Sequence, residues 1–378
     1  MKKFILIPDS FKGTMSSSEI CSIMEEQIHA HLPNAEVISI PVADGGEGSV
    51  DSFLAAVGGK RINVIVKGPY MEDVSGFYGI LEDGITAVIE MAACAGLPLV
   101  GERLQAEKTT TYGVGQLIAA AVKQGCQKII VGLGGSATND MGVGAAAALG
   151  YQFLDAEGKV FVPVGETLSK IARIDASGLL PALKQTELIT MCDIDNPLFG
   201  PSGAAYIFAP QKGADPEMVE FLDGQLRAGA QIILQELGAD VADLPGAGAA
   251  GGMGGGMVAF FGSRLQMGIE TVLDTVGFDS LLQDADVVLS GEGKIDNQSL
   301  RGKVVIGVAR RTKKYGIPLI AVVGDIGDNV EGAYDEGVSA VFSINRVAVD
   351  FHKAKHRSKN DLRLTMDNLM RFFAAFSV

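Results

Sequence analysis

Short apolar segments that run directly into polar, glycine-rich loops are the feature that most constrains the fold of this chain. Residues 3–7 form one such segment and lead into loop 9–14, and residues 36–42 form another and lead into loop 43–48. A helix is expected after each loop, and the first helix has a capping box at 16–19 followed by apolar residues at helical spacing. Strand, loop and helix repeated in this order predict a parallel sheet.

The last third of the chain repeats the pattern. Apolar segments at residues 286–289, 318–323 and 339–343 alternate with predicted helices, the last of which covers 358–376. These three strands and the two at the front predict one five-stranded, doubly wound parallel sheet with helices on both faces. This is a flavodoxin-like or Rossmann-like α/β domain.

The middle of the chain differs from both ends. Residues 77–81 and 85–91 flank Glu82, Asp83 and Gly84 and predict an antiparallel hairpin. Further strands are expected at 128–131 and 187–191, and helices at 115–123, 142–149 and 216–237. We therefore expect a second α/β domain, residues 67–260, inserted into a first domain made of residues 1–66 and 261–378.

Charge and composition exclude several classes of protein. The net charge of -14, from 45 acidic and 31 basic residues, disfavours binding to nucleic acid. Four scattered cysteines predict reduced thiols in a cytoplasmic protein, with neither a disulfide framework nor a zinc site. The apolar start is too short for a signal peptide. The longest uncharged stretch, residues 244–263, is so rich in glycine that we expect neither a membrane span nor a stable helix there.

Ligands of open parallel sheets bind beyond the carboxyl ends of the strands, where these loops lie. The loops pair carboxylates with glycines, and two of them carry a lysine, a combination that suits a magnesium-bound polyphosphate. Ordinary turns and helix caps explain any single loop equally well, but four loops on one sheet edge favour a site. The candidate residues are Asp9, Ser10, Lys12, Asp44, Gly45, Gly46, Glu47, Glu292, Lys294 and Asp296.

The middle segment offers two more candidate loops. GLGGSATND follows a strand and opens a helix, so its amides could cradle an anion; its candidate residues are Gly134, Gly135, Ser136, Asn139 and Asp140. The second loop, CDIDNP, carries Asp193, Asp195 and Asn196 directly after a strand. Its carboxylates could hold a metal or act as a base, and the alternative is an Asx turn before the proline.

Several catalytic plans do not match. Residues 246–251 spell GxGxxG, but no strand precedes them, so we expect a mobile or closely packed loop and not a dinucleotide site. The chain has no GxxxxGK[ST] and no HRD or DFG motif, which excludes P-loop enzymes and protein kinases. None of the four histidines lies in the glycine loops, so catalysis by histidine is not expected.

Seven motifs, in this order, resemble those of bacterial glycerate kinases of the first type: PDSFKGT, VADGGEG, GGSATND, CDIDNPL, APQKGA, PGAGAAGG and SGEGKID. The resemblance covers essentially the whole chain. It implies phosphorylation of D-glycerate with ATP and Mg²⁺ in the cytoplasm, by two α/β domains with the active site in the cleft between them. The chain departs from the family pattern at Met15, Met141 and Lys294; a lysine in place of the expected arginine keeps the charge but loses the bidentate fork.

The resemblance also suggests roles for individual residues. Bacterial members resemble glycerate 2-kinases, so we expect 2-phospho-D-glycerate as the product, with 3-phosphoglycerate as the alternative. Asp193 is expected to be the general base or a magnesium ligand, and Asp296 a second ligand. Lys12 and Lys212, the latter from APQKGA, are expected to hold phosphate or carboxylate groups, and Asp44 to join the catalytic group.

Two other classes remain as alternatives. One is an NAD-dependent oxidoreductase, and the other is a non-catalytic two-domain sensor of a small organic acid. A sensor would not need so many carboxylates beside lysines, and binding of a nicotinamide cofactor would distinguish the oxidoreductase. No nucleic-acid or membrane partner is expected, and a homo-oligomer is compatible with the sequence.

Overall fold

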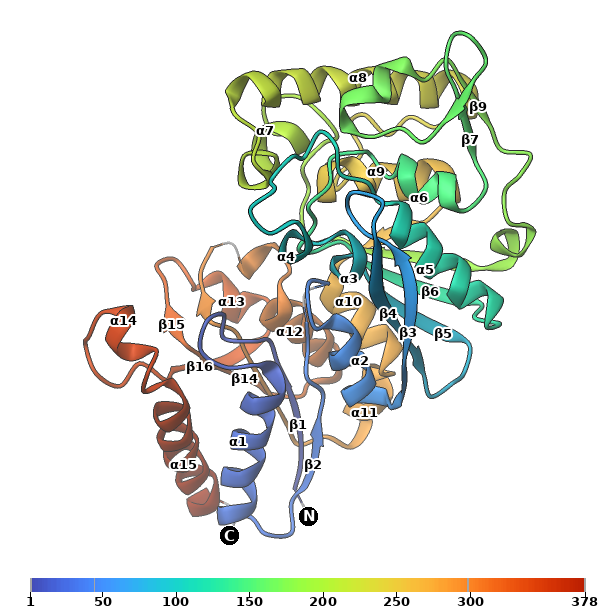
Figure 1. Ribbon diagram of the computed structural model, residues 1–378. Helices are drawn as coiled ribbons and strands as arrows, with labels where there is room; N and C mark the ends of the chain where they lie inside the picture. Colours follow the sequence, from blue (N-terminus) through green and yellow to red (C-terminus); the bar gives the residue numbers. More distant parts are fainter. Residues whose placement is uncertain (1, 44, 298, 377–378) are drawn as a thin grey trace. The chain divides into compact units, whose positions relative to one another are not determined.

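The computed structural model describes residues 2–43, 45–297 and 299–376 (Figure 1). The chain divides into two compact α/β units. The first contains Met1–Asp44, Ala55–Val57 and Ile269–Val378, and the second contains Gly45–Leu54 and Gly58–Gly268. The domain boundaries expected from the sequence, near residues 66 and 261, stay a prediction.

The first unit is built on a five-stranded parallel sheet in the order β16-β14-β12-β1-β2. This confirms the expected doubly wound sheet, since the strand order is that of flavodoxin-like folds. The strands are β1 (Lys3–Pro8), β2 (Glu36–Ser39), β12 (Val287–Gly291), β14 (Leu319–Val323) and β16 (Val338–Ser343). A separate two-stranded ribbon pairs β13 (Lys294–Ile295) with β15 (Asp325–Ile326) in parallel.

Local sequence explains why the first unit folds in this way. Phe4, Leu6 and their neighbours in β1 are buried, as in a strand covered on both faces. At the start of α1 (Ser17–His31) the predicted capping box is present: the Glu19 backbone N–H donates to Ser16 Oγ, and the Ser16 N–H donates to the Glu19 carboxylate. The apolar stripe of α1 is buried, and α1 packs beside α15 (Ser358–Phe376) (Figure 1).

Left-handed backbone separates residues 268–275 and 278–281 of the first unit into two helices. Gly277 adopts a left-handed φ of 64° and ends the first of them. The helices are α10 (Gly268–Thr275), α11 (Phe278–Leu281), α12 (Val304–Tyr315), α13 (Gly332–Asp335) and α14 (Phe351–Ala354).

The second unit contains a six-stranded mixed sheet in the order β11-β10-β6-β5-β4-β3. The expected hairpin is present as the antiparallel pair β4 and β5, while β5, β6, β10 and β11 run parallel. The sequence did not indicate β3, which pairs with β4 along its full length. The strands are β3 (Gly59–Lys67), β4 (Asp73–Leu81), β5 (Thr86–Glu90), β6 (Lys128–Gly132), β10 (Glu187–Met191) and β11 (Arg264–Gln266).

Smaller elements complete the second unit. A three-stranded sheet has the order β8-β7-β9, with β7 (Gln152–Leu154), β8 (Val160–Phe161) and β9 (Arg173–Asp175). The helices are α2 (Ser49–Val57), whose last three residues belong to the first unit, α3 (Ala92–Ala95), α4 (Leu97–Val100), α5 (Tyr112–Lys123), α6 (Val143–Ala148), α7 (Ala204–Phe208), α8 (Pro216–Leu237) and α9 (Ala249–Phe261).

The glycine-dense stretch contains a helix that was not expected within residues 244–263, whereas residues 246–251 form a closely packed segment, one of the two expectations for them. Helix α9 begins inside it, with left-handed backbone at Ala250–Gly252. A Cβ added at Gly251 would lie 2.1 Å from the Thr138 carbonyl oxygen, and one at Gly256 would lie 2.1 Å from that of Met141. The glycines therefore serve close packing of backbone on backbone, which holds the helix in place despite its low propensity.

Buried apolar clusters form the cores, and those defined among the described residues include one in the first unit and two in the second. All four cysteines are free thiols buried in these units, as expected: Cys21, Cys94, Cys126 and Cys192. Burial raises the pKa of Cys21 to about 12, so its thiol stays protonated. Among the described residues, no helix is long and apolar enough to cross a membrane.

Candidate active site

In the first unit, the loops that follow β1 and β12 start side by side. Ile7 lies opposite Ser290 and Pro8 opposite Gly291 in the parallel register. Since β2 lies on one side of β1 and the later strands lie on the other, the strand order reverses here. Ligands of open α/β sheets bind at such a reversal, beyond the carboxyl ends of the strands. Six expected site residues follow these two strands: Asp9, Ser10, Lys12, Glu292, Lys294 and Asp296.

The loop after β1 is held by its own hydrogen bonds. The Asp9 backbone N–H donates to the Gly291 carbonyl (2.8 Å), and the Ser10 N–H donates to the Asp9 carboxylate (2.6 Å). The Phe11 and Met15 backbones bond to each other across a tight turn, which buries the Phe11 ring and leaves Lys12 exposed. The loop thus presents a cation to solvent beside a carboxylate.

Glu292, from the loop after β12, is the most perturbed acid of this group. Its side chain is buried, and its Oε1 has no hydrogen-bond partner among the described residues. Burial, helped by the negative charges of Asp9 and Asp296, raises the pKa of Glu292 to about 7, although Ser299 and Lys303 act in the opposite direction. Buried carboxylate oxygens with open coordination suit a hard divalent cation.

These residues fit Mg²⁺ in the way that nucleotide-dependent enzymes hold it. Within the described ranges, no group of three His, Cys, Asp or Glu side chains is arranged to hold a metal by itself. Magnesium usually takes only one or two carboxylates from the protein, and the rest of its ligands come from phosphates and water. Glu292 and its neighbours Asp9 and Asp296 could supply those carboxylates.

The loop after β12 is also tied to the next loop of the sheet. The Gly324 N–H donates to the Glu292 carbonyl (3.0 Å), and the Asp325 N–H donates to the Gly293 carbonyl (3.1 Å). Lys294 stands on the short ribbon that these bonds begin, and its side chain is exposed. The expected residues of the first unit therefore share one hydrogen-bonded framework.

Replacing Glu292 by glutamine should make stability less dependent on pH. The carboxyl titrates at about 7 in the folded chain and near its ordinary value of 4.5 when unfolded. Between these values the unfolded state binds fewer protons, so the contribution of Glu292 to stability falls as the pH rises, by up to about 3 kcal/mol. Urea unfolding at pH 5 and pH 8 should show that the free energy of unfolding of the variant, relative to that of the wild type, is higher at pH 8 than at pH 5. The same gain in Glu220→Gln, an exposed change on α8, would contradict the assignment.

In the second unit, three parallel strands end in register. Glu90, Gly132 and Met191, at the ends of β5, β6 and β10, are neighbours in the sheet. The loops that follow β6 and β10 are GLGGSATND and CDIDNP, so the register brings the two candidate loops of this unit to one edge. Because both follow parallel strands, their backbone groups face the same end of the sheet.

The loop Gly45–Gly48 packs directly on the loop after β6. The Gly134 N–H donates to the Gly45 carbonyl (2.9 Å). A Cβ at Gly132 would lie 2.4 Å from the Gly45 carbonyl oxygen, and one at Gly134 would lie 2.4 Å from the Gly46 Cα. The two backbones are therefore closer than any side chain permits. Expected residues Gly45, Gly46, Glu47, Gly134 and Gly135 lie in these paired loops, whereas Asp44 lies outside the described residues.

Glu90 was not expected in the site. Its carboxylate is buried at the start of α2 and accepts a long hydrogen bond from the Val50 N–H (3.5 Å). Burial raises the pKa of Glu90, while the amides of Gly48, Ser49 and Val50 lower it. The signal that could have revealed it is a single charge at the end of an apolar strand. Its contacts assign it to holding the loop before α2.

Lys212 is fully enclosed in the second unit. Its ammonium donates to Ser136 Oγ (2.7 Å) and to the Thr138 carbonyl (2.6 Å). Burial lowers the pKa of Lys212 to about 7, and the charge of Asp140 opposes this shift. The lysine therefore ties the segment before α8 to the GGSATND loop through these two hydrogen bonds.

The same loop contains buried polar groups with open hydrogen-bonding capacity. Both amide atoms of Asn139 and the hydroxyl of Thr138 lack partners among the described residues. Asp140 differs, since its carboxylate accepts bonds from the Thr111 N–H (2.7 Å) and hydroxyl (2.9 Å). Unpartnered buried groups are costly, and they are typical of places that bind water or a ligand.

The loop after β10 places Asp193 at the start of another helix. One carboxylate oxygen of Asp193 accepts a hydrogen bond from the Gly268 N–H (2.6 Å) at the first residue of α10, and the side chain is exposed. Asn196 instead points into its own loop, where its amide donates to the Ser202 carbonyl (2.7 Å). Asp193 thus has a fixed orientation and an accessible charge.

Comparison with known proteins followed from this geometry. The sequence model of the glycerate kinase family matches residues 4–374. A glycerate 2-kinase of Escherichia coli (strain K12) is 45% identical over 343 residues, which is 90% of each chain. A glycerate kinase of Bacillus subtilis (strain 168) is 44% identical, with 93% of this chain and 92% of the relative covered. A crystal structure described as a glycerate kinase 2 of Salmonella typhimurium LT2 superposes with a TM-score of 0.88 at 40% identity, covering 99% of this chain and 98% of that one.

Proposed function

This chain belongs to the glycerate kinase family, and we propose that it transfers the γ-phosphoryl group of ATP to the 2-hydroxyl of D-glycerate. The products are 2-phospho-D-glycerate and ADP. The observation that carries the proposal is the 45% identity to the E. coli glycerate 2-kinase over nine-tenths of both chains. The glycine loops lie within residues 4–374, which the family model matches.

Asp193 is the proposed general base. Its carboxylate is exposed and oriented by the Gly268 N–H, so it can meet a substrate hydroxyl without a rearrangement of its own. It accepts the proton of the 2-hydroxyl while the bond from that oxygen to the γ-phosphorus forms. The bond from phosphorus to the bridging oxygen breaks at the same time, and the electron pair leaves on ADP.

The loops of the first unit are proposed to hold the polyphosphate. Lys12 and Lys294 carry exposed ammonium groups that can neutralise phosphate oxygens. Bound Mg²⁺ would neutralise charge on the transferred phosphoryl group, and Glu292 with Asp9 and Asp296 would hold it. Asp44 and the metal role of Asp193 stay predictions.

The role proposed for Lys212 changes with its burial. Its ammonium is committed to Ser136 and Thr138, so Lys212 is a positioning residue for the GGSATND loop and not a direct clamp on substrate. The amides of that loop and of Gly45–Gly48, together with the unpartnered Asn139, supply donors for the anionic end of glycerate.

Phosphorus NMR of the reaction product tests the proposal. Purified protein with ATP, Mg²⁺ and D-glycerate should give a phosphomonoester whose phosphorus couples to one proton, as at carbon 2. Coupling to two protons would show phosphorylation at carbon 3, which would keep the kinase and reverse the regiochemistry. The Asp193→Asn variant, purified in parallel, controls for a contaminating kinase.

Absence of any phosphoglycerate from folded protein would contradict the proposed activity. If such protein still bound glycerate in calorimetry, the sensor alternative would replace the kinase. The cytoplasmic location and a homo-oligomeric state stay predictions from the sequence.

A further inference from the structure

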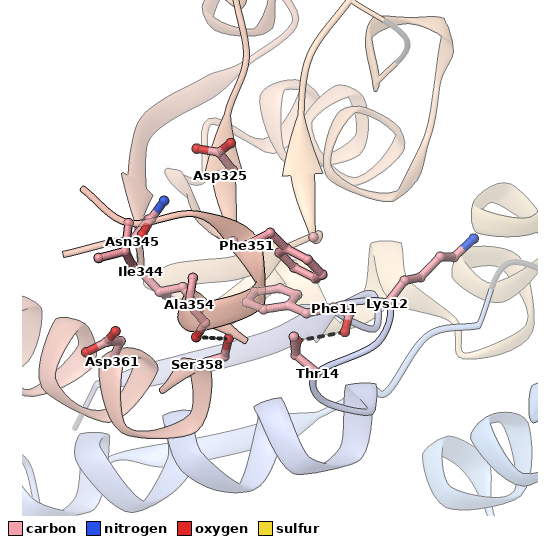
Figure 2. Close-up of a pocket in the computed structure, with 13 residues that line it drawn as sticks. Phe11, Lys12, Thr14, Asp325, Ile344, Asn345, Phe351, Ala354, Ser358 and Asp361 are labelled. Carbon is pink, nitrogen blue, oxygen red and sulfur yellow. Dashed lines mark hydrogen bonds between the residues drawn. The ribbon is translucent and has the colours of Figure 1, made fainter. Parts of the chain in front are cut away.

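A cavity of about 160 Å³ in the first unit has no place in the argument above. Two phenyl rings line it, that of Phe11 from the loop after β1 and that of Phe351 from α14, and Figure 2 shows the rings beside each other while Lys12 reaches away from them. Asp325, the first residue of β15, and Asn345, from the loop after β16, lie among its polar lining residues.

The cavity opens at the edge of the sheet where the candidate phosphate loops lie. Phe11 precedes Lys12 in the turn after β1, and Gly293 lies in the loop that carries Glu292. If Lys12 and the Glu292 loop hold the phosphates of a ligand, the part of the ligand attached to those phosphates would therefore extend into this cavity. In open α/β folds this edge is where nucleotide ligands lie.

The size of the cavity selects one part of a ligand. A cavity of about 150 Å³ holds a molecule such as benzene, so this one accommodates an aromatic ring system but not a whole nucleotide. Glycerate has a carboxylate and two hydroxyls on three carbons, so it has little apolar surface that could contact the two phenyl rings.

The charged side chains of the cavity also favour a neutral ring as its ligand. The charged residues that line the cavity are Lys12, at the side of the phosphate loops, and the acidic Asp325 and Asp361; Asp361 is buried and paired with Arg357 (3.0 Å). Carboxylates on the wall repel a phosphate or carboxylate but not a neutral heterocycle, whose amino and imino groups they can accept. The amide of Asn345 can both donate to and accept from the edge of such a ring.

Exposure of Phe351 is the remaining observation. Its side chain is 62% exposed although it lines the cavity, whereas Phe11 is 3% exposed. An aromatic ring left open to solvent at the mouth of a ring-sized cavity offers a face on which a base can stack.

We propose that this cavity binds the nucleobase of the phosphoryl donor, with Phe351 stacking on the base and Asn345 contacting its edge. The inference rests on the proposed function, because it takes the donor to be a nucleoside triphosphate. It adds the subsite that recognises the base, in which Phe351 and Asn345 lie outside the family motifs while Phe11 belongs to PDSFKGT.

Tryptophan fluorescence can test this directly, because the chain contains no tryptophan. In Phe351→Trp, ADP should quench the single indole saturably, and adenosine should do so at higher concentration. Inorganic tripolyphosphate, which has no base, should leave the signal unchanged. Phe372→Trp is the matched control, since Phe372 is 63% exposed on α15 of the same unit. Neither ADP nor adenosine should quench its fluorescence.

Kinetics give a second readout. Because stacking on an aromatic side chain contributes strongly to base binding, Phe351→Ala should raise KM for ATP by about 10–100-fold. KM for D-glycerate should change less than about twofold. Quenching of the Phe372→Trp signal would place the base elsewhere and overturn the inference, as would unquenched Phe351→Trp protein that binds ADP like the wild type in calorimetry. Wild-type protein that binds no ADP would instead remove the proposed function, and the inference with it.

Discussion

Replacing Asp193 by asparagine should lower kcat by about 10²–10⁴-fold while the protein stays folded. Asparagine keeps an oxygen that can accept the hydrogen bond from the Gly268 N–H, so the start of α10 remains capped. What the variant loses is the negative charge that takes the proton of the hydroxyl. Steady-state rates at saturating ATP and D-glycerate measure the loss, and KM for ATP should change little.

Asp215→Asn is the matched control for that experiment. Asp215 is also exposed and also caps a helix, accepting the Met218 N–H (2.8 Å) at the start of α8. It lies in none of the candidate loops, so the same substitution there should leave kcat within about twofold of the wild type. Equal losses in both variants would mean that helix capping, and not proton transfer, explains the effect at Asp193.

Replacing Gly134 by alanine should damage both stability and activity. The new Cβ would stand 2.4 Å from the Gly46 Cα, a backbone atom that cannot move without displacing the whole loop. Overpacking of this kind costs about 3 kcal/mol. Displacement of the two glycine loops by about 1 Å should also lower kcat/KM by about 10²-fold. Urea unfolding and steady-state kinetics measure the two effects.

Gly224→Ala in α8 is the control for Gly134→Ala, and it is expected to stabilise the protein. No atom lies within 4 Å of a Cβ added there, and the residue is inside a helix. Alanine should therefore raise stability by up to about 1 kcal/mol and leave activity unchanged. If Gly134→Ala proved as harmless as this control, the close contact between the two glycine loops would not be what holds the site.

The first unit could be read from the sequence because its signals are local. The capping box at Ser16 and Glu19, the buried apolar segment of β1 and the polar loop after it each depend on a few neighbouring residues. The helix expected at about 358–376 is present as α15. The parallel, doubly wound sheet followed from the repeated order of strand, loop and helix, whereas the strand order came from the structure.

The second unit was harder because distant contacts decide it. The side chains of β3 are mostly exposed or only partly buried, so its sequence carries a weak strand signal, and its pairing with β4 fixes it as a strand. Helix α9 contradicts the low helix propensity of glycine, and only the nearby backbone at Thr138 and Met141 explains it. Nothing in APQKGA shows that Lys212 is enclosed, since its partners come from residues more than seventy positions earlier in the chain.

The pairing of β1 with β12 has a consequence for synthesis on the ribosome. Phe4 of β1 pairs with Val287, 283 positions later in the chain. At about 5–20 residues per second, β1 leaves the ribosome about 15–60 s before its neighbour exists. During that time an apolar strand has no partner on that side, which is a hazard for aggregation in crowded cells. Pro8 and Asp9 at its end interrupt the apolar run and limit its length as a template for other nascent chains.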